Sequence, residues 1–105
     1  MDELESIWTV PVDHPAFAGH FPGQPIVPGV VLLDHAIHLA DTWLQRPEGL
    51  WRVDSAKFFR PVGPGLVLSY VLRVRPSGAV AFSVSEGEPE SRREVASGVL
   101  SPNDA

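Results

Sequence analysis

One segment of this chain has a helical pattern, and this constrains the fold more than any other feature of the sequence. Pro28 suits the first position of a helix, and Pro47 and Gly49 predict its end near Arg46. The segments 4–12, 50–62, 66–76, 79–87 and 93–101 are instead rich in alternating β-branched and aromatic residues. One helix and five strands, the last four in unbroken succession with short turns, predict an α+β domain with an antiparallel sheet packed on the helix.

The spacing of apolar residues predicts which face of each element is buried. On the helix, the recurring apolar positions are Val30, Leu33, Ile37, Ala40 and Leu44. On the strands, the expected inner faces carry Leu66, Leu68, Tyr70, Leu72 and Val74 in one segment, and Val80, Phe82 and Val84 in the next.

Length and composition limit the classes of function. A chain of 105 residues predicts a single domain over residues 1–105, with residues 102–105 as a frayed tail. A net charge of −5 argues against general binding to nucleic acids or anionic membranes. There is no cysteine, no apolar run approaches the roughly 20 residues of a membrane span, and the first residues lack a signal pattern. We therefore expect a cytoplasmic domain.

A loop rich in proline and glycine, residues 13–27, precedes the helix and contains His20. The helix start at Gly29 offers unpaired backbone N–H groups that can receive a negative oxygen. His20 and Asp34 could supply a base and an acid, which suits proton abstraction beside a carbonyl. Such a histidine is commonly structural, and an aspartate on a helix is commonly solvated. Asp34, however, shares the register of Val30, which predicts a place near the buried face, where an unpaired carboxylate is costly.

The stretch GHFPGQPIVPGVVLLD, residues 19–34, closely resembles the active-site signature of the β-hydroxyacyl-acyl-carrier-protein dehydratases, which have the hotdog fold. AKFFRPVGPG and VASGVL resemble a later strand with its turn and the last strand of that family, so the resemblance covers residues 8–101. It implies a sheet in the order 1-3-4-5-2 wrapped around a central helix. It also implies a homodimer whose active sites lie at the interface, each with histidine and acid from different subunits.

By this resemblance, the substrate is a 3-hydroxyacyl thioester on an acyl carrier protein or coenzyme A, and no cofactor is needed. His20 would take the proton next to the thioester carbonyl, Asp34 would protonate or orient the departing hydroxyl, and the Gly29 N–H would bind the thioester oxygen. The residues expected to shape the loop or line the acyl channel are Phe17, Phe21, Pro22, Val30 and Val31.

Two departures from the family pattern concern the acid. Asp34 stands where the most common branch of the family has glutamate. The bifunctional dehydratase–isomerases and several relatives in secondary metabolism have aspartate at this position, as this chain does. His38 stands one turn later, where the family usually has glutamine, and we expect it to orient Asp34 as a neutral hydrogen-bond partner. The short chain and the DHPAFAGHFPG loop are similar to the compact dehydratases of polyketide-like pathways.

The other histidines and the basic residues receive simpler interpretations. His14 and His35 are expected to be structural or exposed, and the four histidines lack the close spacing of a metal site. An acidic carrier protein would need a basic docking surface, for which the candidates are Arg46, Arg52, Lys57 and Arg60, although ordinary surface charge explains them equally well.

Two alternatives to a dehydratase stay open. The chain could be a non-catalytic subunit that holds an active partner in a heterodimer of two hotdog chains. It could also be a thioesterase of the same fold, which uses a carboxylate to activate water.

Overall fold

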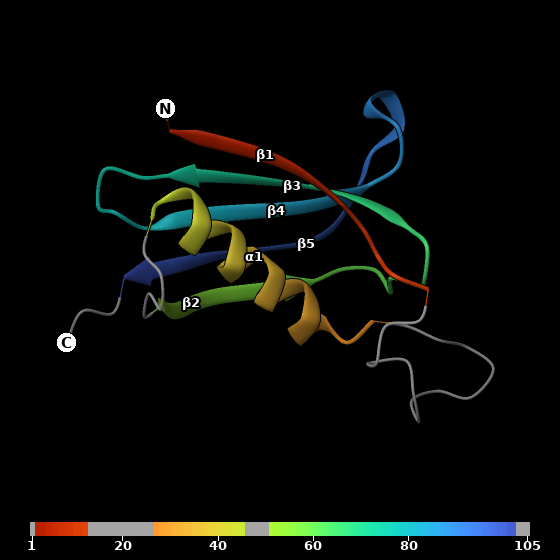
Figure 1. Cartoon of the computed structure of the whole chain (residues 1–105), viewed down its shortest axis with the longest axis horizontal. Coiled ribbons are helices and arrows are strands. Elements are labelled where there is room, and N and C mark those ends of the chain that lie inside the picture. The colour runs from red at the N-terminus through yellow and green to blue at the C-terminus, as the bar shows by residue number, and fades with distance from the viewer. Residues whose placement is uncertain (1, 13–26, 46–50, 103–105) are drawn as a thin grey trace.

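The computed structural model describes residues 2–12, 27–45 and 51–102. Its elements confirm the predicted α+β class, with one helix and five strands in these ranges (Figure 1). They are β1 (Glu3–Thr9), α1 (Gly29–Trp43), β2 (Trp51–Phe58), β3 (Val67–Val74), β4 (Val80–Glu86), a short 3₁₀ turn (Pro89–Ser91) and β5 (Arg93–Pro102). No helix within the described ranges is long and apolar enough to cross a membrane.

The five strands form one sheet in the order β1-β3-β4-β5-β2, with every neighbouring pair antiparallel. This is the order that the resemblance implies. Figure 1 shows α1 lying across one face of the sheet, with β1 and β2 as the two edge strands. The helix therefore covers one sheet face, and no other helix among the described residues covers the opposite face.

The core lies between α1 and the sheet, and the two central strands supply much of it. Leu68, Tyr70 and Leu72 on β3 are fully buried, and Leu66 and Val74 pack partly buried against the core. Val80, Phe82 and Val84 on β4 are buried beside them, so the predicted inner faces are confirmed. Alternation along a pleated strand is sufficient to identify these positions.

Gly98 on β5 lies where another chain segment approaches very closely. A Cβ atom there would collide with the Ser55 carbonyl oxygen and would lie 2.6 Å from Cζ of Phe82. The pairing of β2 with β5 shifts register between Val53 and Ser55, which marks a bulge beside this contact. The absence of a side chain at Gly98 lets the bulged backbone and the Phe82 ring share one space.

The buried face of the helix agrees with the prediction at Ala40 and is rotated from it at the start of the helix. Leu32, Ala36 and Ala40 are its buried residues, whereas Leu33, Ile37 and Leu44 flank them partly buried. The side away from the sheet, here called the exposed stripe, consists of Val30, Asp34, His38 and Thr42.

The expected burial of Val30 and Asp34 is therefore wrong for the single chain. The small side chains of Ala36 and Ala40 form the line of contact with the sheet, and Val30 lies off this line. Val30 is 67% exposed, and the carboxylate of Asp34 lies on an open surface.

The ends of two elements also differ from expectation. The helix ends at Trp43, earlier than predicted, and Leu44 caps it by donating its N–H to the Ala40 carbonyl. Pro102 is the last residue of β5, so the expected tail does not begin there. Pro102 pairs with Trp51 of β2 at the end of β5, beyond the last pair of β5 with β4, where a missing N–H is tolerated.

Candidate active site

The start of α1 leaves backbone donors open. The helix begins at Gly29, directly after Pro28, and no side chain of the described residues caps it. The Pro28 carbonyl accepts the N–H of Val31 at 2.9 Å, while the N–H groups of Gly29 and Val30 precede the first intrahelical donors. They lie at the positive end of the helix dipole, where a developing negative charge is stabilised. This end of the helix can therefore receive an oxyanion.

A short segment after β2 holds the helix start in place. The N–H of Val27 donates to the carbonyl of Val62 at 2.6 Å, so the two chain segments lie side by side. Beyond the end of β2, the N–H of Phe59 donates to the Val95 carbonyl at 2.8 Å, which extends the pairing with β5. The helix start thus rests on a part of the chain that is itself tied to the sheet.

Phe58, at the end of β2, packs directly on Gly29. Carbons Cδ1 and Cε1 of the Phe58 ring lie 2.9 Å from the position that a Cβ atom of Gly29 would occupy. Contacts this short are not observed for real Cβ atoms, so the ring and a side chain at position 29 exclude each other. A side chain at position 29 would therefore require the Phe58 ring to move from this position.

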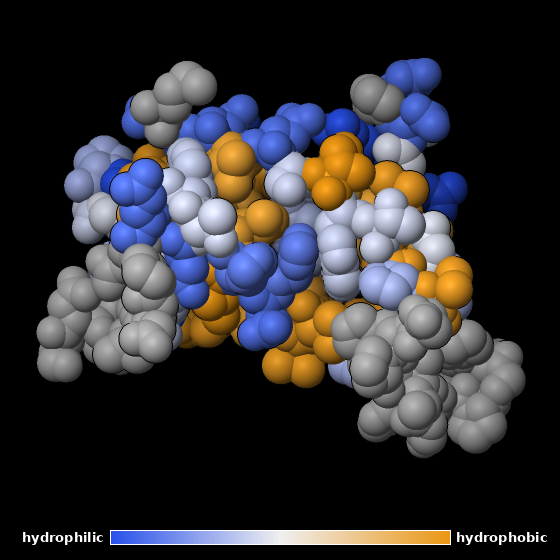
Figure 2. Space-filling view, in the orientation of Figure 1, coloured by the Kyte–Doolittle hydropathy of each residue, from blue (hydrophilic) through white to orange (hydrophobic). Residues whose placement is uncertain are grey.

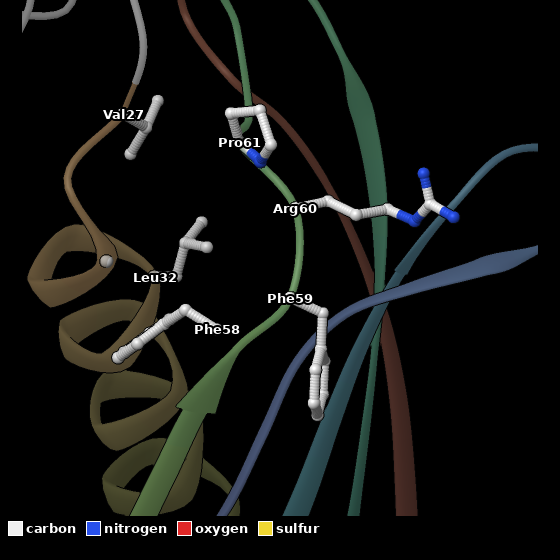
Figure 3. A pocket seen from close by; sticks show the side chains of 7 residues that line it. Val27, Leu32, Phe58, Phe59, Arg60 and Pro61 are labelled. Carbon is white, nitrogen blue, oxygen red and sulfur yellow. The ribbon is translucent and has the colours of Figure 1, made fainter.

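A cavity of about 300 Å³ opens between the helix start and the end of β2. Figure 3 shows Val27, Leu32 and Phe58 on the helix side of the strand, whereas the side chains of Phe59 and Arg60 lie on its other side. The described residues that line the cavity are Val27, Gly29, Leu32, Phe58, Phe59, Arg60 and Pro61. This mostly apolar space beside open N–H groups can hold an acyl chain with its carbonyl at Gly29.

The structure brings together only part of the predicted site. Gly29 lines the cavity, whereas Val30 and Val31, expected in the acyl channel, are not among the described lining residues. Leu32, Phe58 and Pro61 line it without having been singled out from the sequence. The AKFFRP segment contains a signal for Phe58, because its aromatic pair lies at the end of a strand that resembles a strand of the dehydratase family.

Asp34 and His38 lie together on the exposed stripe, one helical turn apart. The candidate base, His20, lies outside the described residues. The other loop residues named from the sequence, His14, Phe17, Phe21 and Pro22, also lie outside them, as does the docking candidate Arg46. The distance between the candidate acid and base is therefore not part of the described geometry.

His35 lies between two aromatic rings on the sheet side of the helix. Its ring stacks on Trp8 of β1 with centroids 4.4 Å apart and meets Tyr70 of β3 edge-on at 4.9 Å. Burial is the main cause that lowers the pKa of His35, and the nearby His38 lowers it further, whereas Asp34 acts in the opposite direction. The imidazole therefore has a packed environment that favours its neutral form, in keeping with the structural interpretation of His35.

The basic residues named as docking candidates have different surroundings. Arg52 donates from Nε to Asp54 at 2.8 Å. A hydrogen bond from Ser101, followed by that from Arg52, lowers the pKa of the Asp54 carboxyl. Lys57 and Arg60 are both exposed. Arg60 contributes to the cavity wall while its side chain points away from Val27 and Leu32 in Figure 3.

Three comparisons with known proteins bear on this site. A family model described as ApeI-like, ApeI dehydratase, matches residues 1–99. The chain is 40% identical to the 3-hydroxyacyl-acyl-carrier-protein dehydratase FabZ of Brucella melitensis biotype 1, over 66% of this chain and 50% of that protein. It spans from about half to three fifths of the length of the curated relatives it matches.

Solved structures share the fold over almost the whole chain. An uncharacterized protein from Erwinia carotovora subsp. atroseptica is 33% identical with a TM-score of 0.81, covering 96% of this chain and 82% of that one. The dehydratase heterocomplex ApeI:P from Xenorhabdus doucetiae is 24% identical with a TM-score of 0.82, covering 95% and 86%. These neighbours and the strand order confirm the hotdog fold. Because the family model covers nearly the whole sequence, the chain belongs to the ApeI-like dehydratase family.

Proposed function

We propose that this protein removes water from a 3-hydroxyacyl thioester to give the trans-2-enoyl thioester. A base takes a proton from C2, the double bond forms between C2 and C3, and the C3 hydroxyl leaves with a proton as water. Atoms and electrons balance without an oxidant or a cofactor. The observation that carries the proposal is the apolar cavity that meets the open N–H of Gly29, in a chain matched throughout by a dehydratase family.

His20 is the proposed base and Asp34 the proposed acid in this reaction. The N–H of Gly29 holds the thioester oxygen as negative charge develops on it, and the helix dipole stabilises that charge. His38, one turn from Asp34, orients the acid. Phe17, Phe21, Pro22, Val30 and Val31 are the proposed walls of the acyl channel, with Phe58 and Leu32 added from the cavity lining.

The proposed site is completed by a second subunit. In the single chain Asp34 lies on the exposed stripe beside the apolar Val30, and Phe58 and Phe59 at the cavity are 47% and 52% exposed. Figure 2 shows hydrophobic side chains along the lower edge of the helix-bearing face, over α1 and β2. A second copy that covers this side would bury these apolar groups and bring its own His20 to Asp34.

The basic test is the product of the purified protein with 3-hydroxyacyl groups of several lengths on pantetheine and on an acyl carrier protein. We expect the enoyl product by mass spectrometry, and we expect it to disappear in His20→Ala. If the wild type forms no enoyl product at any length, or if His20→Ala retains full turnover, the proposal is wrong. Release of free thiol instead of enoyl product would identify a thioesterase.

The shared site has its own test, because two inactive variants can complement each other. In a mixed dimer of His20→Ala and Asp34→Asn, one of the two sites has both an intact histidine and an intact aspartate. Random mixing should therefore restore about a quarter of wild-type activity, since half of the dimers are mixed and each has one working site. No recovery after subunit exchange, confirmed by mass spectrometry of the mixed dimer, would contradict a site shared between copies.

A heterocomplex is the second candidate, favoured by one finding. The Xenorhabdus doucetiae neighbour is a dehydratase heterocomplex, and the same uncovered side could accept a different hotdog chain. The homodimer would then be inactive, and activity would appear only with the partner. The wild-type assay on the protein alone separates the two candidates.

The carrier of the acyl group is proposed to be an acyl carrier protein that docks on Lys57 and Arg60, two exposed basic residues that end β2 and follow it. Arg46 is a further candidate, and Arg52 is a weaker one because it is already paired with Asp54. Arg60→Glu should raise KM for the protein-bound substrate and leave KM for the pantetheine substrate unchanged. An equal change for both substrates would place Arg60 at the acyl site instead.

A further inference from the structure

Three aromatic side chains pack together where the first half of α1 contacts the sheet, one from the helix and two from the strands. The proposed reaction assigns no role to them. We call Trp8, His35 and Tyr70 the aromatic clamp. His35 stacks on Trp8 with an angle of 17° between the ring planes, and the two rings of Trp8 and Tyr70 lie edge-on at 6.5 Å. The clamp thus joins the helix to two neighbouring strands, β1 and β3, through one helical residue.

Tyr70 also holds the helix by a hydrogen bond. Its hydroxyl donates to the backbone carbonyl of Leu32 at 3.1 Å, and both side chains are buried. Burial raises the pKa of Tyr70, so the hydroxyl keeps its proton and remains a donor. A buried hydroxyl without a partner is costly, so this bond fixes the distance between β3 and the first turn of the helix.

The residues held by the clamp belong to the two turns that carry the proposed chemistry. Leu32 lies in the turn that begins at Gly29, and His35 directly follows Asp34. Since an α-helix is stiff over two turns, fixing Leu32 and His35 against the sheet also fixes the directions of the Gly29 N–H and the Asp34 side chain. Asp34 itself is exposed, and the helix backbone sets the direction of its Cα–Cβ bond.

We propose that the aromatic clamp sets the rotation of α1 about its own axis and thereby aligns the Gly29 N–H and Asp34 for the reaction. Trp8, His35 and Tyr70 are positioning residues in this view, since they act through the helix. The effect on catalysis rests on the proposed function, whereas the effect on the alignment of the helix does not.

The other end of the helix offers a matched control. Near the helix C-terminus, Asp41 accepts a hydrogen bond from Nε1 of Trp51 on β2 at 2.6 Å. This bond also ties the helix to the sheet through a side chain, but it lies about two turns beyond Asp34. Asp41→Ala therefore weakens the attachment of the helix without touching the clamp.

The kinetic test compares Tyr70→Phe and His35→Leu with Asp41→Ala. For the two clamp variants we expect kcat to fall roughly 10- to 100-fold with little change in KM, because small misalignments of reacting groups have effects of this size. His35→Phe, which keeps a ring between Trp8 and Tyr70, should retain most of the wild-type kcat. Asp41→Ala should lower the thermal midpoint and leave kcat unchanged. The proposal is overturned if both clamp variants keep kcat within twofold, or if Asp41→Ala loses as much as they do.

A measurement without substrate keeps the alignment separate from the proposed activity. In NMR spectra, Tyr70→Phe should shift the backbone amide signals of Gly29 and Asp34 more than that of Gly78, which lies in the turn between β3 and β4. If the wild type is inactive, the proposed function fails, and these signals alone decide on the clamp. Unchanged Gly29 and Asp34 signals in a folded Tyr70→Phe protein would overturn it.

Discussion

The two sides of α1 have different tasks and different surroundings. The side toward the sheet carries the buried residues of the helix, Leu32, Ala36 and Ala40. The exposed stripe on the other side carries Asp34 and His38. In the proposed function, the acid is thus separated from the helix's buried contacts, on opposite sides of one helix. The four predictions below test this separation, from the largest expected effect to the smallest.

The exposed stripe should carry activity and little stability. Asp34→Asn keeps the size and polarity of the side chain but removes its acid. We expect dehydration to slow by about 10²–10⁴-fold, while the free energy of unfolding changes by less than about 0.5 kcal/mol, because the side chain is exposed in the single chain. Steady-state kinetics and urea unfolding on the same preparation measure both. A large loss of stability would contradict the separation.

The sheet-facing side should carry stability. Leu32 is 3% exposed, so Leu32→Ala leaves a cavity and should cost about 2–5 kcal/mol of unfolding free energy. Thr42→Ala, on the exposed stripe of the same helix, is the matched control and should change it by less than about 0.5 kcal/mol. Urea unfolding with an unchanged m value checks both variants. Equal costs at the two positions would contradict the separation.

Gly29 lies where the two sides meet, and its substitution should cost about 1–3 kcal/mol because the new methyl group of Gly29→Ala collides with the Phe58 ring. The double variant Gly29→Ala, Phe58→Leu should recover part of this loss, since a smaller side chain leaves room. A double-mutant cycle of unfolding free energies measures the coupling between the two positions. Strict additivity would show that the ring moves aside freely.

The smallest effect concerns His35. Folding lowers the pKa of His35, mainly through burial and to a smaller extent through the nearby His38. The His35 side chain therefore binds a proton more readily in the unfolded chain. Stability should therefore be complete above about pH 6.5 and decrease as the pH falls below that value. His35→Phe should lose this part of the pH dependence in thermal unfolding between pH 7 and pH 5. An identical slope in the variant would assign the dependence to other groups.

Much of the fold could be predicted from the sequence, because strands with one buried face alternate plainly. Leu68, Tyr70 and Leu72 alternate with residues of the outer sheet face, and the structure buries all three. The helix was harder, because the apolar Val30 lies on the exposed stripe, while Ala36, on the line of contact with the sheet, gives only a weak apolar signal. The predicted burial of Asp34 failed for this reason.

Only those parts of the candidate site that lie within a sequence motif could be predicted. The open helix start follows from Pro28 and Gly29, whereas Phe58 reaches Gly29 through the pairing of β2 with β5, which no local pattern encodes. The clamp is a further case, since Trp8 and Tyr70 are 62 residues apart and meet at His35 only through the order of the strands. The pairing of His20 with Asp34 stays a prediction.

Gly98 has a consequence for how sequences of this kind can diverge. The Ser55 carbonyl and the Phe82 ring occupy the space of any side chain at this position, and a backbone carbonyl cannot be exchanged for a smaller group. A mutation at position 98 therefore becomes acceptable only if the bulge in β2 disappears and the aromatic residue at position 82 shrinks in the same lineage. Homologues with a side chain at position 98 should therefore also lack the bulge and the large ring.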